Sequence, residues 1–305
     1  MKENFNSTNL RKESTGSSSR NTFHLKIVTY LAVIVSVFLI VIKFIAWVYT
    51  DSVSILSGLV DSSLDAIASV INLIAVRQAL IPADSDHRFG HGKAEALSGL
   101  AQSTFIFGSI VFLIIEVIPR LFSPEIIKNS NIGLVITFIS LFITMVLVIY
   151  QRYVIRKTNS LAISADSFHY FSDLMLNCGV IFALLISVHL GLLIADPIIA
   201  LSIGLFILYG AYKIFRTSFD QLMDKEFPIS ERKKITEIVI EHKGVLGIHD
   251  LRTRRAGSGG FIQLHLDLKA DISLIEAHEI SEGVEKKLIN CFPNSEIIIH
   301  QDPIS

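Results

Sequence analysis

The sequence is poor in the residues on which small secreted proteins depend, because its 305 positions include only two cysteines. Cys178 falls in an apolar run and Cys291 in a charged region, and this placement argues against a disulfide framework. The chain also lacks an HExxH motif, a phosphate-binding loop and a nucleophile elbow. These absences disfavour a disulfide-stabilised scaffold and the enzyme classes that those motifs mark.

Charge is scarce as well, and hydrophobic residues take its place. Asp, Glu, Lys and Arg make up 18% of the chain and hydrophobic residues 51%, which is too apolar for an ordinary soluble domain. A membrane helix needs about 20 apolar residues to cross the hydrocarbon layer. Six runs of that kind are predicted to span a membrane: 25–49, 53–80, 96–121, 131–151, 161–190 and 197–219. The polar residues 1–24 are predicted to form a disordered tail rather than a signal peptide.

The basic residues predict the orientation of these spans. They gather in the N-terminal tail and in the second and fourth connections, whereas the first and fifth connections have none. Because short cytoplasmic connections are enriched in Lys and Arg, both termini are expected on the cytoplasmic side.

After residue 220 the composition becomes that of a soluble domain. An amphipathic helix is predicted to open at Ser230 after Pro228, followed by two alternating strands across the turn GSGG. A second helix with a capping box of Ser273 and Glu276 and a last strand, EIIIHQ, complete an αββαβ order. The predicted fold class is an all-α six-span helical membrane domain, 25–220, plus a small cytoplasmic α+β domain, 221–305.

Two pairs of ionisable residues interrupt the apolar runs. Asp61 and Asp65 are four apart in the second span, and His169 and Asp173 are four apart in the fifth, so each pair shares one helix face. A buried Asp at a helix centre costs roughly 2.5–3.5 kcal/mol, so a compensating partner is expected. One imidazole and three carboxylates suit a small divalent metal, zinc best, with Fe(II) and Mn(II) possible as well. The alternative is polar contact between helices or a water-filled vestibule.

The charge of this group predicts a mechanism. Empty and fully ionised, it carries three negative charges with a neutral His169. A low-dielectric site of that charge takes up protons when it is empty, so metal and protons compete for the same atoms. Exchange of metal for protons is the expected cycle.

Two further groups are weaker candidates for metal ligands. His87 and His91 lie four apart in the second connection with Asp84 and Asp86 nearby, and a solvated loop is the alternative. In the soluble region, alternation places His265 on the strand face opposite Leu264 and Leu266. Four more residues complete that group, although the sequence alone favours a scatter of unconnected surface residues: His249, His278, His300 and Asp302.

From about residue 25 onward the sequence resembles the cation diffusion facilitator family. The resemblance rests on SVSIL, the two-aspartate span, FGHGKAE, the His169 and Asp173 pair, HDLRTR and IIHQDP, all in matching order. It implies a homodimer in the bacterial inner (plasma) membrane, with six spans per subunit and a copper-chaperone-like cytoplasmic domain. It further implies export of a divalent metal in exchange for protons by alternating access, and no enzymatic activity or nucleic-acid partner.

The resemblance also implies roles for individual residues. It places the transport site on Asp61, Asp65, His169 and Asp173, and a charge link between Lys93 and Asp224. It assigns a loop site to Asp84, His87 and His91, although Asp86 stands where a neutral residue is expected. It assigns a binuclear cytoplasmic site to His249, His265, His278, His300 and the bridging Asp302. The implied metal is Zn2+, both as transported ion and as structural ion, with Fe2+, Cd2+ or Mn2+ as other transported ions. The alternative function is that of a membrane-anchored metal sensor or partner-binding receptor.

Overall fold

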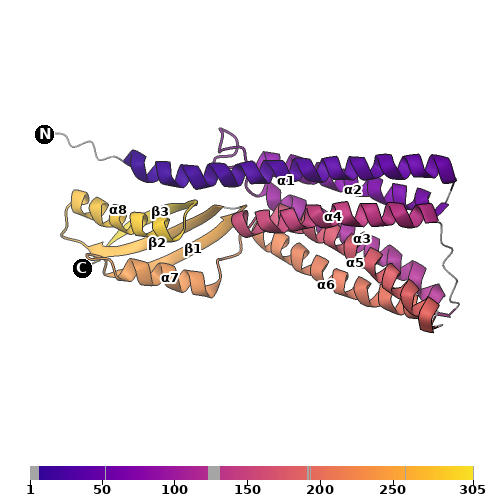
Figure 1. Cartoon of the computed structure of the whole chain (residues 1–305). Coiled ribbons are helices and arrows are strands. Elements are labelled where there is room, and N and C mark those ends of the chain that lie inside the picture. Colours follow the sequence, from indigo (N-terminus) through magenta and orange to yellow (C-terminus); the bar gives the residue numbers. More distant parts are fainter. Residues whose placement is uncertain are drawn as a thin grey trace.

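The computed structural model describes residues 7–51, 53–122, 131–190, 192, 194–257 and 259–304. Six long helices form one elongated body and a small α+β domain lies at one end of it (Figure 1). The long helices are α1 (Ser7–Thr50), α2 (Val53–Ala79), α3 (Ala94–Phe122), α4 (Asn131–Thr158), α5 (Leu161–Leu190) and α6 (Ala195–Leu222). Each contains a stretch long and apolar enough to cross a membrane, which confirms the six predicted spans.

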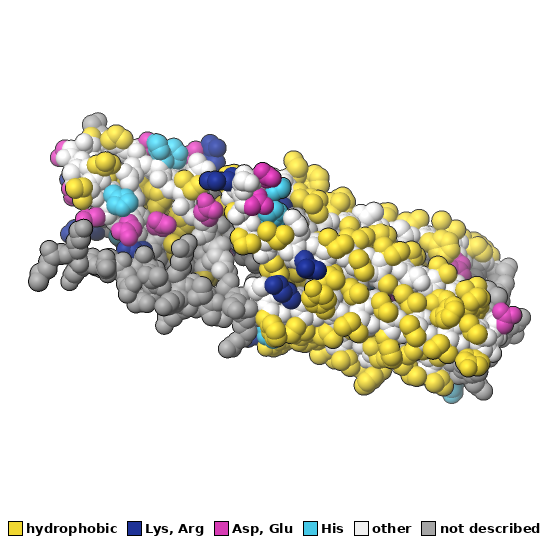
Figure 2. Space-filling view, turned by 90° about the horizontal axis from the view of Figure 1, so that it is seen from above, with side chains coloured by type: hydrophobic (Ala, Val, Ile, Leu, Met, Phe, Trp, Pro, Cys, Tyr) yellow, Lys and Arg dark blue, Asp and Glu magenta, His cyan; other side chains and the backbone are white. Residues whose placement is uncertain are grey.

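The surface of the helical body is apolar over most of its length. Large hydrophobic side chains are exposed on all six helices, among them Phe38, Phe107, Phe142 and Phe182. In Figure 2 they form a nearly continuous yellow field, and most charged side chains lie at or beyond its end next to the small domain. Since such a surface would aggregate in water, it indicates contact with lipid.

Close helix contacts hold the bundle together. α3 packs mainly against α6, and α1 against α2. A Cβ atom at Gly210 of α6 would overlap the ring of Phe168 on α5, so the absence of a side chain there lets the two helices approach. Small residues have this function in many membrane helix pairs.

The N-terminal part of α1 differs from the prediction. A disordered tail was expected up to residue 24, but the helix begins at Ser7, and residues 1–6 lie outside the described part. Adding a turn to an existing helix avoids the cost of nucleation, so a membrane helix can extend into a polar segment of modest helix propensity.

The small domain has the predicted αββαβ order. It comprises α7 (Ile229–Ile240), β1 (Gly247–Ala256), β2 (Gly259–Lys269), α8 (Leu274–Cys291) and β3 (Ser295–Ile304). β2 lies between β1, which is antiparallel to it, and β3, which is parallel. Ile262, Leu264, Leu266 and Leu268 of β2 are buried with residues of α7 and α8, so the helices cover that face of the sheet.

Of the two predicted helix starts in this domain, the structure confirms one and moves the other by one residue. Ser273 accepts a hydrogen bond from the backbone N–H of Glu276 at 3.2 Å, as an N-cap residue should. The first helix begins at Ile229 rather than at Ser230, with Pro228 in the capping position. The backbone of Pro228 is extended, at φ −51° and ψ 147°, and the helical conformation begins directly after it.

Candidate metal sites

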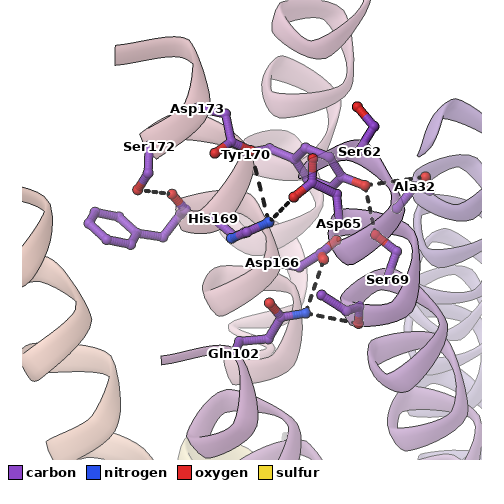
Figure 3. A network of polar contacts seen from close by, with 12 residues as sticks. Ala32, Ser62, Asp65, Ser69, Gln102, Asp166, His169, Tyr170, Ser172 and Asp173 are labelled. Atoms are coloured by element: carbon purple, nitrogen blue, oxygen red, sulfur yellow. Dashed lines mark hydrogen bonds and ion pairs between the residues drawn. The ribbon is translucent and has the colours of Figure 1, made fainter. Parts of the chain in front are cut away.

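Three of the four predicted intramembrane ligands meet between α2 and α5. His169 Nε2 lies 2.8 Å from Asp65 Oδ1 and 3.9 Å from Asp173 Oδ2. One ligand atom of each residue lies within 4.8 Å of those of the other two. Figure 3 shows the three side chains pointing toward one another from the two helices. We name this group the membrane triad.

The membrane triad is largely enclosed by protein. The side chains of His169 and Asp65 are 10% and 13% exposed, and that of Asp173 is 28% exposed. Asp173 Oδ2 is buried and has no hydrogen-bond partner among the described residues. A carboxylate oxygen left without a donor in such a place is costly, and a cation bound between the three groups would compensate it.

Asp61 lies outside the membrane triad. Its side chain is exposed and is absent from the group of close ligand atoms. The expectation of four converging residues is therefore met for three in this structure. Asp61 lies about one helical turn from Asp65 on α2, and its carboxylate does not belong to the group in this structure.

A buried polar network adjoins the membrane triad, and the sequence reasoning missed it. Asp166, 1% exposed, accepts hydrogen bonds from Gln151 at 2.7 Å and from Gln102 at 3.4 Å. The hydroxyls of Tyr170 and Ser69 lie 2.6 Å apart (Figure 3). Asp166 precedes His169 by three residues in a helix, a spacing that could have identified it as a neighbour on the same face.

Glu95 at the start of α3 fixes the beginning of α5. Its carboxylate, on a residue 3% exposed, accepts hydrogen bonds from Ser160 Oγ at 2.6 Å, from the N–H of Leu161 at 2.9 Å and from that of Ala162 at 3.4 Å. A negative charge is favourable at the N-terminus of a helix. Glu95 thereby holds the helix that carries His169 and Asp173.

The predicted loop residues form a second group. Asp84 lies 3.5 Å from His87 Nδ1 and 3.4 Å from His91 Nε2, and the two imidazole rings are 4.5 Å apart. The hydrogen bond from the backbone N–H of His87, followed by that of Asp86, holds the pKa of the Asp84 carboxyl below its usual range. Asp84, not Asp86, belongs to the group of close ligand atoms. The buried Nδ1 of His91 has no partner among the described residues.

A row of histidines crosses the sheet of the small domain. His265 on β2 pairs with His249 on β1 and with His300 on β3. Asp302 lies 2.8 Å from His265 Nδ1, 3.2 Å from His249 Nε2 and 3.3 Å from His300 Nε2. The hydrogen bond with His265, supported by the charges of the three histidines, lowers the pKa of Asp302. We name these four residues the sheet cluster.

The sheet cluster differs from the predicted five residues in two respects. His278 is exposed on α8, and no contact among the described residues joins it to the cluster, because α8 packs on the opposite, apolar face of the sheet. Asp267, which was not predicted, lies 3.0 Å from His249 Nδ1. It follows His265 by two residues, so strand alternation could have identified it.

The predicted charge link joins the two parts of the chain. Lys93 Nζ lies 2.9 Å from Asp224 Oδ1. Partial burial acts to raise the pKa of Asp224, but the hydrogen bond and charge of Lys93, with help from Arg254, outweigh it and lower the pKa. The guanidinium of Arg254 also stacks on Phe89 of the loop, at 4.8 Å, and on Phe261 of β2, at 4.6 Å. The loop is thus docked on the small domain.

Comparisons with known proteins agree with this architecture. A family model described as the cation efflux transmembrane domain matches residues 29–223, and one described as the cation efflux protein, cytoplasmic domain, matches residues 228–304. The chain belongs to the cation efflux family. The resemblance to cation diffusion facilitators is therefore confirmed, as is the fold class of six spans followed by a small α+β domain.

Relatives of this cation efflux protein match nearly its whole length. The cation-efflux pump FieF of Cronobacter sakazakii (strain ATCC BAA-894) is 48% identical over 274 residues, which cover 90% of this chain and 91% of that protein. FieF of Serratia proteamaculans (strain 568) is 46% identical over 267 residues, 88% and 89% of the two chains. A solved structure of CzrB in its zinc form is 34% identical, covers 26% of this chain and 92% of its own, and has a TM-score of 0.25.

These matches establish the general activity. The cation efflux family member is a multi-pass membrane transporter of cations and not an enzyme, since both parts of the family are present and its relatives are pumps. This finding disfavours the alternative of a receptor or sensor without transport, because the family model for the cation efflux transmembrane domain matches residues 29–223.

Proposed function

We propose that this cation efflux protein exports a divalent metal ion, zinc foremost, in exchange for protons. The observation that carries the proposal is the membrane triad, in which two carboxylates and an imidazole converge inside a bundle of six membrane spans. Ionisable side chains at such depth are retained for function.

The ligand atoms of the membrane triad favour a borderline or hard divalent ion. One imidazole nitrogen and carboxylate oxygens suit Zn2+, and they also admit Fe2+, Cd2+ and Mn2+. Asp61 would supply the fourth ligand by turning its exposed side chain toward the level of Asp65 when cargo binds. The Cβ atoms of residues four apart on a helix lie about 5–6 Å from one another, so one metal ion between them can contact both carboxylates.

Proton exchange follows from the charge of these groups. Three carboxylates and an imidazole bind a divalent ion only in their deprotonated forms, so metal binding releases protons and proton binding releases metal. Access to the site from one side of the membrane at a time turns this competition into antiport. An inward proton gradient would then drive metal out of the cell.

The remaining predictions complete the proposal. The chain would act as a homodimer in the bacterial inner membrane with both termini in the cytoplasm, consistent with the basic residues Arg77, Arg152 and Arg156 near one end of the spans. The sheet cluster would hold resident Zn2+, whose borderline character matches imidazole and carboxylate donors, and His278 would join it only after a rearrangement or from the second subunit. The loop group of Asp84, His87 and His91 would be a further zinc site.

Flux of several metals into proteoliposomes tests the proposal. The purified protein and its Asp65→Asn and Asp173→Asn variants are compared with Zn2+, Fe2+, Cd2+ and Mn2+ side by side. Asp51→Asn is the matched control, because Asp51 is an exposed aspartate at the end of α1 whose left-handed backbone, φ 43°, an asparagine also adopts. Both triad variants should lose metal flux while the control keeps it. Undiminished flux in either folded triad variant would contradict the assignment.

A further inference from the structure

A lysine inside the membrane bundle has no part in the transport site described so far. Lys43 lies in α1, seven residues before the end of that helix at Thr50, and is half-buried. Its ammonium donates hydrogen bonds to Ser62 Oγ at 2.7 Å and to the backbone carbonyl of Gly58 at 3.0 Å. Seven residues correspond to about 10 Å of helix, yet the ammonium binds the neighbouring helix instead of reaching toward the membrane surface.

The sequence of α2 is suited to receive this ammonium. Ser62 is 2% exposed, so its hydroxyl is presented inside the bundle. A Cβ atom at Gly58 would lie 3.7 Å from Lys43 Nζ, which is ordinary van der Waals contact, so the end of the lysine side chain lies directly against α2. Asp61 lies in the same turn of α2, between these two partners. Gly58 and Asp61 are three residues apart and therefore share one face of α2, so the ammonium lies on the turn that carries the Asp61 carboxyl.

We infer that Lys43 is a resident cation of the transport site, a positioning residue that offsets one of its three carboxylates. The inference rests on the proposed function of Asp61, Asp65 and Asp173 in metal transport. Three ionised carboxylates and one ammonium leave two negative charges beside a neutral His169, and a divalent ion neutralises them. The loaded site is then electroneutral, which is the least costly state for a group enclosed by protein and lipid.

This charge balance has a consequence for cargo release. Without the lysine charge, a divalent ion would sit among three uncompensated carboxylates and would be held more tightly. The apparent KM for metal should then fall and the maximal rate should fall with it, because release becomes slow. A lysine that only ties α1 to α2 would affect folding or maximal rate but would not change the KM in this direction.

The experiment measures metal-concentration dependence of Zn2+ flux in proteoliposomes for Lys43→Met, Lys43→Gln and Lys43→Arg. Lys43→Met, which removes the charge at similar length, should lower KM by roughly tenfold or more, with a lower maximal rate. Lys43→Gln, which keeps an N–H donor, should behave in the same way, whereas Lys43→Arg should stay within about twofold of the wild type because the charge remains. Lys213→Met, at an exposed lysine of α6, is the matched control and should change neither parameter.

Two results would overturn the inference. One is an unchanged KM in both uncharged variants; the other is an equal loss of rate in Lys43→Met and Lys43→Arg with KM unchanged, which would make the lysine a tether only. Asp65→Asn, measured in parallel, separates this inference from the proposed function. If that variant transports metal like the wild type, the proposed transport site fails, whatever the lysine variants show.

Discussion

Replacement of Glu95 should weaken the anchoring of the helix that carries His169 and Asp173. The carboxylate of Glu95 accepts hydrogen bonds from Ser160, Leu161 and Ala162 at the N-terminus of α5. A hydrogen bond to a charged group contributes roughly 1.5–3 kcal/mol, and a lost helix cap costs about 0.5–2 kcal/mol. Because water can replace part of the contacts near the helix end, we expect Glu95→Ala to lower the free energy of unfolding by about 2–4 kcal/mol.

Glu95→Gln separates charge from hydrogen bonding at this position. The amide oxygen still accepts from the helix N-terminus, but the favourable interaction of a negative charge with the helix dipole, up to about 2 kcal/mol in buried geometry, is lost. Its cost should therefore lie between those of the wild type and Glu95→Ala. The control is Glu237→Gln, at an exposed glutamate of α7.

The assay is chemical unfolding of the purified protein in detergent, together with Zn2+ flux in proteoliposomes. The expected order of stability is wild type, Glu95→Gln, then Glu95→Ala, with flux reduced in the same order because α5 positions two of the proposed ligands. A Glu95→Ala protein within about 0.5 kcal/mol of the wild type would refute this role, since ordinary surface substitutions fall in that range.

Two further predictions concern the cytoplasmic side. Lys93→Ala should lower the free energy of unfolding by less than about 1 kcal/mol, because the ion pair with Asp224 is partly exposed. The pKa of Asp224 is lowered from 3.8, so the ion pair stabilises the fold fully above that pH, and its contribution is lost as the pH falls through the lower folded value. Unfolding measured across pH 2–6 should therefore show a difference between the variant and the wild type that disappears in acid. The isolated residues 221–305, which contain their own hydrophobic core, should dimerise more tightly with Zn2+ in analytical ultracentrifugation. The double variant His265→Ala, His300→Ala should abolish this dependence on zinc. Dimerisation of the unaltered domain that does not depend on zinc would contradict a metal role for the sheet cluster.

The spans, the strand order and the membrane triad could be predicted from sequence because each rests on a repeating pattern. Apolar length reports membrane helices, alternation reports strands, and the four-residue spacing of His169 and Asp173 reports a shared helix face. The same spacing could not settle whether Asp61 and Asp65 both reach the partner helix, since that depends on the relative height of α2 and α5. The contact between Glu95 and the start of α5 was also out of reach, because it joins residues 65 positions apart.

Strand register explains both the success and the miss in the cytoplasmic domain. The pairing of His265 with His249 and His300 depends on how three strands align, and sequence showed only that His265 faces away from the core. His278 lies on α8, and the position of α8 relative to the sheet is set by its packing against buried residues such as Ile262 and Leu264. The local sequence pattern does not show which face of the sheet that helix covers.

The most direct test of proton-coupled metal export is simultaneous measurement of both ions in proteoliposomes. With a pH-sensitive dye inside the vesicles and Zn2+ added outside, the wild type should move protons in the direction opposite to metal, and an imposed pH gradient should accelerate or reverse Zn2+ flux according to its sign. Asp173→Asn should abolish both signals together. Zn2+ flux that continues at the same rate whatever the pH gradient, with no counter-movement of protons, would contradict the account and indicate uncoupled metal transport.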